Sequence, residues 1–335
     1  MAMSSSYALP QSSVFPSVWR KIIKFISEPE FPYPLGFFRI GVSLLAIVQV
    51  VVLWPHLLQL YGNFGFIQWN VIETGTDIWV PSIGKLCVLL QPYGISSSTC
   101  VYGVFVSYFI CLVGLFIGWK TRLFAVCAWL LHGLTVNSGY ISLYGVDTML
   151  HISLFYCAWM PVGGAFTIRH LLHRETVVPS FMARISQRTL QVHLCIIYFS
   201  TGLAKIRGIQ WRNGEAIWRA LMQPQFSVFD MSWLASIPLI PKLAAWSILL
   251  LEIAYVVLIW PKRSRVIWLM GISLLHLSIG LLMGLWLFAT IMIIMNITAF
   301  GFDLLYRHSS ERVAPERKMV FSGCALGDNR RPSLS

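Results

Sequence analysis

Residues 251–293 read LEIAYVVLIWPKRSRVIWLMGISLLHLSIGLLMGLWLFATIMI, and this stretch decides the fold. Apolar segments stand on either side of the short basic turn PKRSR, and each is long enough to cross a bilayer as a helix. The composition of all 335 residues agrees, with 57% hydrophobic and 11% charged residues and a mean hydropathy of +0.70. A soluble core cannot bury so much apolar surface, so the sequence predicts an all-α, polytopic membrane helix bundle.

About eight membrane-spanning helices fit the hydropathy of the chain. The expected spans are Leu35–Trp54, Val101–Gly118, Leu123–Asn137, Asp147–Phe166, Leu190–Ile206, Leu243–Trp260, Val266–Leu282 and Leu285–Tyr306. Only Met283 and Gly284 separate the last two, so one broken helix over 266–306 is the alternative there. Two longer segments, 55–100 and 210–241, carry several tryptophans, which prefer the headgroup level of a membrane. We expect interfacial helices on the outer face, which either roof a cavity or only anchor the chain.

The basic residues set the orientation of the chain. Of the 25 Lys and Arg residues, 18 fall in the two terminal segments and in alternate loops, which predicts cytoplasmic N- and C-termini. This placement accounts for the net charge of +12 without a nucleic-acid partner. Residues 1–34 are interpreted as a cytoplasmic tail whose basic amphipathic stretch, VWRKIIKFI, lies on the inner membrane surface. Residues 35–306 form the expected transmembrane domain, and 307–335 a polar, disordered cytoplasmic tail.

Lys205 stands at the end of an apolar helix, within the sequence IIYFSTGLAKIRGIQWRNGEAIW of residues 196–218. An ammonium in or beside hydrocarbon is costly, which makes Lys205 a candidate functional residue. An amine in an apolar site also gives up its proton more easily and can then act as a base or a nucleophile. Gln191 and Tyr198 precede it at intervals of seven residues, on nearly the same helix face. The alternative is a lysine that snorkels to the outer headgroups.

Asp147 and His151 lie four residues apart at the start of the fourth expected span, so they share a helix face. A carboxylate one turn from an imidazole fixes its tautomer and raises its basicity, as proton relays require. The alternative is that Asp147 serves only as an N-terminal cap of the helix.

Three consecutive expected spans each carry a polar residue near the middle, namely Glu252, His276 and Asn296. An unpaired carboxylate at that depth costs about 2.5–3.5 kcal/mol, so Glu252 is expected to face inward and to be either protonated or paired. Arg39, near the inner end of the first span, is its expected partner. The three residues form either a helix-packing network or a path for protons or solutes.

The seven cysteines show no spacing typical of a metal site, and none is expected. Cys87 and Cys100 stand in one of the expected outer segments, where a disulfide between them is an open alternative.

These residues resemble a known group, the horizontally transferred transmembrane (HTTM) domain family, which includes the vitamin K-dependent gamma-carboxylase. The resemblance covers about Phe37 to Phe302. It rests on the segments FRIGVSL, LLQLYGNFGF, LYGVDTMLHISLF and QVHLCIIYFSTGLAKIRGIQWRNGEA and on residues 251–293. The chain looks most similar to the bacterial branch of sporulation-delaying-protein B, whose members take part in maturing a secreted peptide toxin.

The resemblance implies specific roles for residues in the spans. In the carboxylase an intramembrane lysine is the base that reacts with vitamin K hydroquinone and oxygen, and Lys205 in TGLAK matches it. His276 matches a second family residue. The spacing of Asp147 and His151, independently of the resemblance, makes them the candidate relay for any catalysis by Lys205. A quinol-type cofactor is implied by analogy, with the candidate binding residues Tyr198, Trp211 and Asn137.

The expected function is the maturation or modification of a secreted peptide in a bacterial cell membrane. The implied partners are the lipid bilayer, a secreted precursor peptide and a partner maturation protein. Catalysis, if present, would be carboxylase-like or peptide-modifying. The competing interpretation is a non-enzymatic transporter, immunity or scaffold membrane protein.

Overall fold

The structure is a computed structural model that describes residues 17–66, 68–139, 143–226, 228–302 and 304. Nearly all of these residues lie in helices joined by short loops, and the β-type contact among them is a single bridge between Glu30 and Ser180. The expected all-α fold is therefore confirmed. Residues 1–16 of the expected N-terminal tail, the end of the eighth span and the whole 307–335 tail lie outside the described residues.

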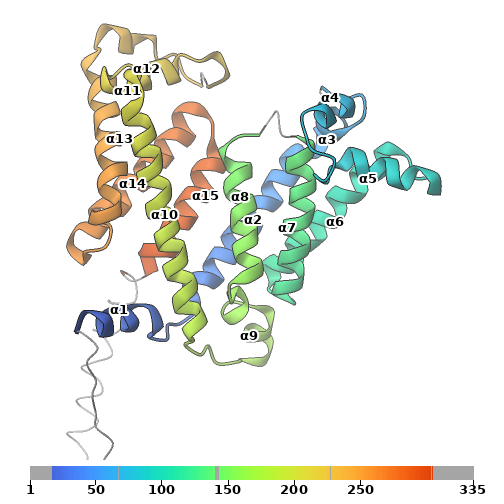
Figure 1. Cartoon of the computed structure of the whole chain (residues 1–335), viewed down its shortest axis with the longest axis horizontal. Coiled ribbons are helices and arrows are strands. Elements are labelled where there is room, and N and C mark those ends of the chain that lie inside the picture. Colours follow the sequence, from blue (N-terminus) through green and yellow to red (C-terminus); the bar gives the residue numbers. More distant parts are fainter. Residues whose placement is uncertain (1–16, 67, 140–142, 227, 303, 305–335) are drawn as a thin grey trace, which may run out of the picture.

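Eight helices occupy the positions of the expected spans (Figure 1). They are α2 (Tyr33–Leu53), α6 (Ser97–Ile117), α7 (Thr121–Ser138), α8 (Gly145–Trp159), α10 (Phe181–Arg207), α13 (Leu239–Leu258), α14 (Lys262–Met283) and α15 (Trp286–Asn296). They form two groups, because α2, α6, α7 and α8 pack together, as do α10, α13, α14 and α15. Helix α15 also contacts α2 and α8, so it joins the two groups.

Within the described residues, five helices are long and apolar enough to cross a membrane, namely Tyr33–Tyr61, Ser97–Ile117, Phe181–Arg207, Leu239–Leu258 and Lys262–Met283. A sixth span results if the pair Gly145–Trp159 and Val162–His173, bent by 63°, counts as one. The chain is accordingly a multi-pass membrane protein. The expected count of eight stays a prediction, since α7 does not pass this test and the apolar helix Trp286–Gly301 is shorter than a full span.

The last two helices, α14 and α15, are separate in the described part of residues 266–306. Gly284 has a φ of 72°, a left-handed conformation that ends α14 and that glycine adopts without strain. Helix α15 begins two residues later and ends in a π-helical turn, Ile297–Gly301. The chain thus reverses direction within a very short break.

Arg39 is fully buried in α2, but its partner is not the carboxylate that the sequence predicted. Its guanidinium donates to the carbonyl oxygens of Leu115 and Phe116 at 2.5 Å, of Phe166 at 2.6 Å and of Val162 at 3.3 Å. The last carbonyls of a helix have no partner within the helix, and Arg39 satisfies two of them at the end of α6. The expected pairing of Arg39 with Glu252 is therefore wrong.

Short helices cover both ends of the bundle (Figure 1). At one end lie α3 (Leu57–Tyr61), α4 (Trp69–Thr74), α5 (Ile83–Leu90), α11 (Ile209–Arg212) and α12 (Ala216–Leu221), within the two tryptophan-rich segments. At the other end lie α1 (Ser17–Ser27), which runs across the bundle, and α9 (Ile168–His173). The tryptophan-rich segments thus form helices at one end of the bundle, as the sequence predicted.

Candidate functional site

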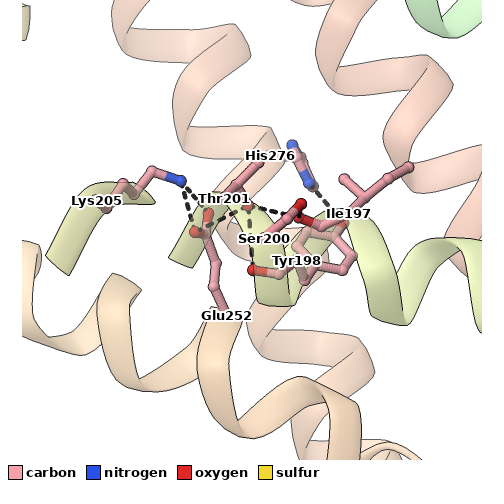
Figure 2. Close-up of polar contacts among 7 residues, drawn as sticks. All are labelled: Ile197, Tyr198, Ser200, Thr201, Lys205, Glu252 and His276. Carbon is pink, nitrogen blue, oxygen red and sulfur yellow. Dashed lines mark hydrogen bonds and ion pairs between the residues drawn. The ribbon is translucent and has the colours of Figure 1, made fainter. Parts of the chain in front are cut away.

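Lys205 and Glu252 form a close ion pair between α10 and α13 (Figure 2). The Lys205 Nζ atom lies 2.5 Å from each carboxylate oxygen of Glu252, and the hydroxyl of Thr201 donates to the same carboxylate at 3.3 Å. The Glu252 side chain is 7% exposed and that of Lys205 is 25% exposed. A buried carboxylate needs a cationic or hydrogen-bonding partner, and here that partner is Lys205.

Gly202 is the residue that lets the two helices approach each other at this pair. A Cβ atom at position 202 would lie 2.8 Å from a side-chain carbon of Ile253, next to Glu252 on α13. The small residue in TGLAK therefore serves close helix packing, which brings Lys205 within reach of the carboxylate. Because the Lys205 ammonium contacts Glu252, and lies 5.4 Å from the centre of the Trp211 ring, it is not a simple snorkelling lysine.

A second polar group lies one to two turns away along α10. The Tyr198 hydroxyl is 2.8 Å from Nε2 of His276, and Asn296 Nδ2 donates to the same hydroxyl at 2.7 Å. Asn296 Nδ2 also donates to the carbonyl of Met292, and Tyr255 donates to Asn296 Oδ1 at 2.7 Å. His276 and Asn296 are thus connected through Tyr198, whereas Glu252 pairs separately with Lys205.

The direction of this hydrogen-bond chain follows from its fixed end. The Met292 carbonyl can only accept, which assigns the amide nitrogen of Asn296 as the donor toward Tyr198. The Tyr198 hydroxyl then accepts from Asn296 and has its own proton left to donate to Nε2 of His276. A neutral His276 consequently carries its proton on Nδ1, which has no partner among the described residues.

Residues of both polar groups line one cavity of about 530 Å³ between α10, α12, α13, α14 and α15. Its size falls in the range of roughly 300–1,000 Å³ that is typical of small-molecule sites. Its polar lining is formed by Tyr198, Thr201, Lys205, Glu252, His276 and Ser278, and its apolar lining includes Trp211, Ile217, Leu221, Ile248, Leu282 and Phe288. The sequence suggested one cavity around Lys205, His151 and His276; Lys205 and His276 line this cavity, His151 does not, and α12 covers part of it.

Asp147 and His151 lie in the other group of helices and do not line this cavity. Asp147 accepts from Gln49 at 2.7 Å and from the backbone N–H of Tyr144 at 3.2 Å, at the beginning of α8. His151 instead pairs with His132 of α7, with 3.3 Å between their Nδ1 atoms. The N-cap of α8 is Tyr144 rather than Asp147, and Asp147 contributes to capping from the third helical position, by accepting from the Tyr144 backbone. The relay to His151 is not formed among the described residues.

Sequence reasoning missed two residues that contact Asp147 and His151. Gln49 and His132 are polar residues within apolar stretches, and they are 8% and 2% exposed. The same signal that singled out Glu252 could have found them, since buried polar residues in a membrane helix need a partner.

The remaining candidates lie away from the cavity. Asn137 is half-buried and donates to the carbonyl of Pro81 at 3.0 Å, and it does not line the cavity with Lys205. Gln191 donates to the carbonyl of Ala299 and accepts from Arg188, each at 2.5 Å. Of the predicted Gln191–Tyr198–Lys205 stripe, the last two residues line the cavity and Gln191 does not.

Cys87 and Cys100 are buried free thiols, so the structure contains no disulfide between them. Burial, followed by a hydrogen bond with Cys100, raises the pKa of Cys87 to about 12. Within the described ranges, no group of three or more His, Cys, Asp or Glu residues could hold a metal ion.

Comparison of the chain with protein-family models, with curated proteins and with solved structures found no match. The function is therefore argued from the site.

Proposed function

We propose that this protein is an HTTM-type membrane protein that takes part in maturing or modifying a secreted peptide, with Lys205 as the base. The single observation that carries the proposal is the Lys205–Glu252 pair on the wall of an apolar cavity, with Tyr198 and His276 on the same wall. We infer further that the protein belongs to a bacterial cell membrane and has cytoplasmic termini.

The cavity lining suits an amphipathic ligand such as a quinol. Polar groups gather around Lys205 and His276, and apolar side chains from α13, α14 and α15 form most of the remaining wall. A quinol-type group bound there would supply a weakly acidic hydroxyl and two reducing electrons. The residues of this chain would bind and orient its polar end and exclude water around it.

The proposal gives Glu252 the role of the group that takes a proton from Lys205. An ammonium must first give up a proton before it can act as a base, and Glu252 is the acceptor at 2.5 Å.

The competing function is a transporter, immunity protein or scaffold in which Glu252, His276 and Asn296 line a path for protons or solutes. The bend of 63° between Gly145–Trp159 and Val162–His173 favours it, because broken helices are common in transporters. No residue of these two bent helices lines the Lys205 cavity. We therefore favour a function in which the cavity binds a ligand that reacts with Lys205.

The test compares the peptides secreted by cells with and without the gene, by mass spectrometry, to identify a peptide whose mass depends on the protein. Lys205→Arg is expected to abolish the mass change at normal membrane abundance, because arginine keeps a cation beside Glu252 but does not give up its proton near neutral pH. Lys205→Ala should abolish the mass change too, with a lower membrane abundance, because it leaves the buried Glu252 without its cation. Lys242→Arg is the matched control, because Lys242 is not part of the cavity lining, and it should behave like the unaltered chain. Full modification with Lys205→Arg would overturn the proposal.

A further inference from the structure

Helix α1 has two chemically different faces, and both are exposed. Trp19, Ile22, Ile23 and Ile26 are 41–55% exposed and fall within an arc of about 100° around the helix. The exposed basic residues Arg20, Lys21 and Lys24 occupy the other side. Within the described part of the chain, no apolar surface covers these four large side chains.

The position of α1 is fixed at its C-terminal end. The carbonyl of Phe25 accepts from Arg184 at 2.9 Å and from Arg188 at 3.3 Å. The Arg188 guanidinium also lies 3.7 Å from the centre of the Phe25 ring. Glu30, just beyond the helix, pairs with Arg184 at 2.7 Å and forms the backbone bridge to Ser180. These contacts hold α1 across the end of the bundle rather than along it (Figure 1).

This geometry matches a membrane interface. A helix that lies across the ends of membrane-spanning helices runs roughly in the plane of the bilayer surface. Its apolar face can then enter the boundary of the acyl chains, while its basic residues remain at the headgroups. Lys24 contacts Glu28 at 4.0 Å, and no ion pair involves Arg20 or Lys21 within the ranges that the structure describes. The basic face is thus largely available to anions.

We propose that α1 is a binding site for anionic lipid headgroups, which contact Arg20, Lys21 and Lys24 while Trp19 and the three isoleucines enter the bilayer boundary. A zwitterionic surface would satisfy the apolar face but not the three cations, so charge complementarity selects anionic lipid. Each basic residue near such a surface contributes about a fivefold gain in affinity. The site is independent of the Lys205 cavity and would remain if the proposed chemistry were wrong.

The test is hydrogen exchange of the backbone amides of Ser17–Ser27 in the full-length protein, reconstituted in nanodiscs of phosphatidylcholine with or without phosphatidylglycerol. We expect slower exchange in α1 when phosphatidylglycerol is present, and loss of this difference at high salt. The triple variant Arg20→Gln, Lys21→Gln, Lys24→Gln should lose the response while α1 stays helical, because glutamine is a good helix former.

A matched variant removes the same charge elsewhere. Lys85→Gln, Arg212→Gln, Lys242→Gln alters three basic residues outside α1, in the segments of α5, α11 and α13, and should respond to phosphatidylglycerol like the unaltered chain. Equal exchange in the two lipids, or equal loss of the response in both triple variants, would overturn the proposal. A response that persists at high salt would show an apolar contact without headgroup recognition and would overturn it as well.

Discussion

At the scale of single residues, the buried charges of Arg39 and Glu252 have partners that helix packing brought to them. Arg39 satisfies carbonyl groups at the end of α6 and beyond α8, and Glu252 accepts from Lys205. Both residues were recognisable in the sequence as polar groups in apolar spans. Their partners come from elements far apart in the chain, so spacing along one helix could not identify them.

The Lys205–Glu252 pair predicts strong energetic coupling. Lys205→Met leaves a carboxylate that is 7% exposed without its cation, and we expect a loss of about 3–5 kcal/mol in the free energy of unfolding. Glu252→Leu should cost less, because the 25% exposed ammonium can turn toward water. The double variant should recover much of the loss, as measured by unfolding in mixed micelles with increasing denaturing detergent.

Arg39 supplies the control for this comparison of single and double variants. Since Arg39 and Glu252 have different partners, the losses from Arg39→Lys and Glu252→Leu should add within about 0.5 kcal/mol. Strong coupling between these two positions would contradict the contacts described above, as would additive losses for Lys205→Met and Glu252→Leu.

At the scale of the helices, glycines control where elements end and how closely they pack. Gly284 ends α14 in a left-handed conformation, and Gly202 allows α13 to approach α10. Both positions shape the cavity, since α10, α13, α14 and α15 all contribute to its lining.

Gly284→Ala and Gly103→Ala should therefore have opposite effects. At Gly284, with φ 72°, alanine is strained and its Cβ would lie 3.2 Å from Val228, so we expect a loss of about 1 kcal/mol. Gly103 lies inside α6 with nothing within 4 Å of a Cβ, so alanine should stabilise that helix by about 0.5–1 kcal/mol. Thermal unfolding in detergent, monitored by circular dichroism, measures both. Equal effects of the two substitutions would contradict the turn at Gly284.

At the scale of the whole molecule, the two groups of four helices contain separate polar clusters. The first group holds Asp147 with Gln49, and His132 with His151. The second group holds Lys205 with Glu252, and Tyr198 with His276. This division explains why Asp147 and His151, the expected relay, do not reach the proposed base Lys205.

The orientation of the molecule in the membrane is a prediction from its basic residues, and labelling can check it. In intact cells an impermeant maleimide should label Ser98→Cys and should spare Ser310→Cys until the membrane is permeabilised, because the positive-inside rule places the C-terminus in the cytoplasm. The signal of the unaltered chain, with its native cysteines, is the baseline. The reverse pattern would show that the orientation is wrong.

The sequence by itself determined that the chain is an all-helical, multi-pass membrane protein, and it placed the long helices at nearly their observed positions. This information is local, because the hydropathy of a segment and a break such as PKRSR both depend on consecutive residues. It also identified Lys205, Glu252 and His276, since polar residues in hydrocarbon stand out individually.

Only the tertiary structure decided which of these residues meet. The rotation of each helix about its axis, and the close approach that Gly202 permits, bring Glu252 to Lys205 rather than to Arg39. The same packing separates His151 from the cavity and pairs it with His132. Contacts between helices depend on surfaces assembled from distant segments, and the period of one helix does not specify which neighbour its polar face will contact.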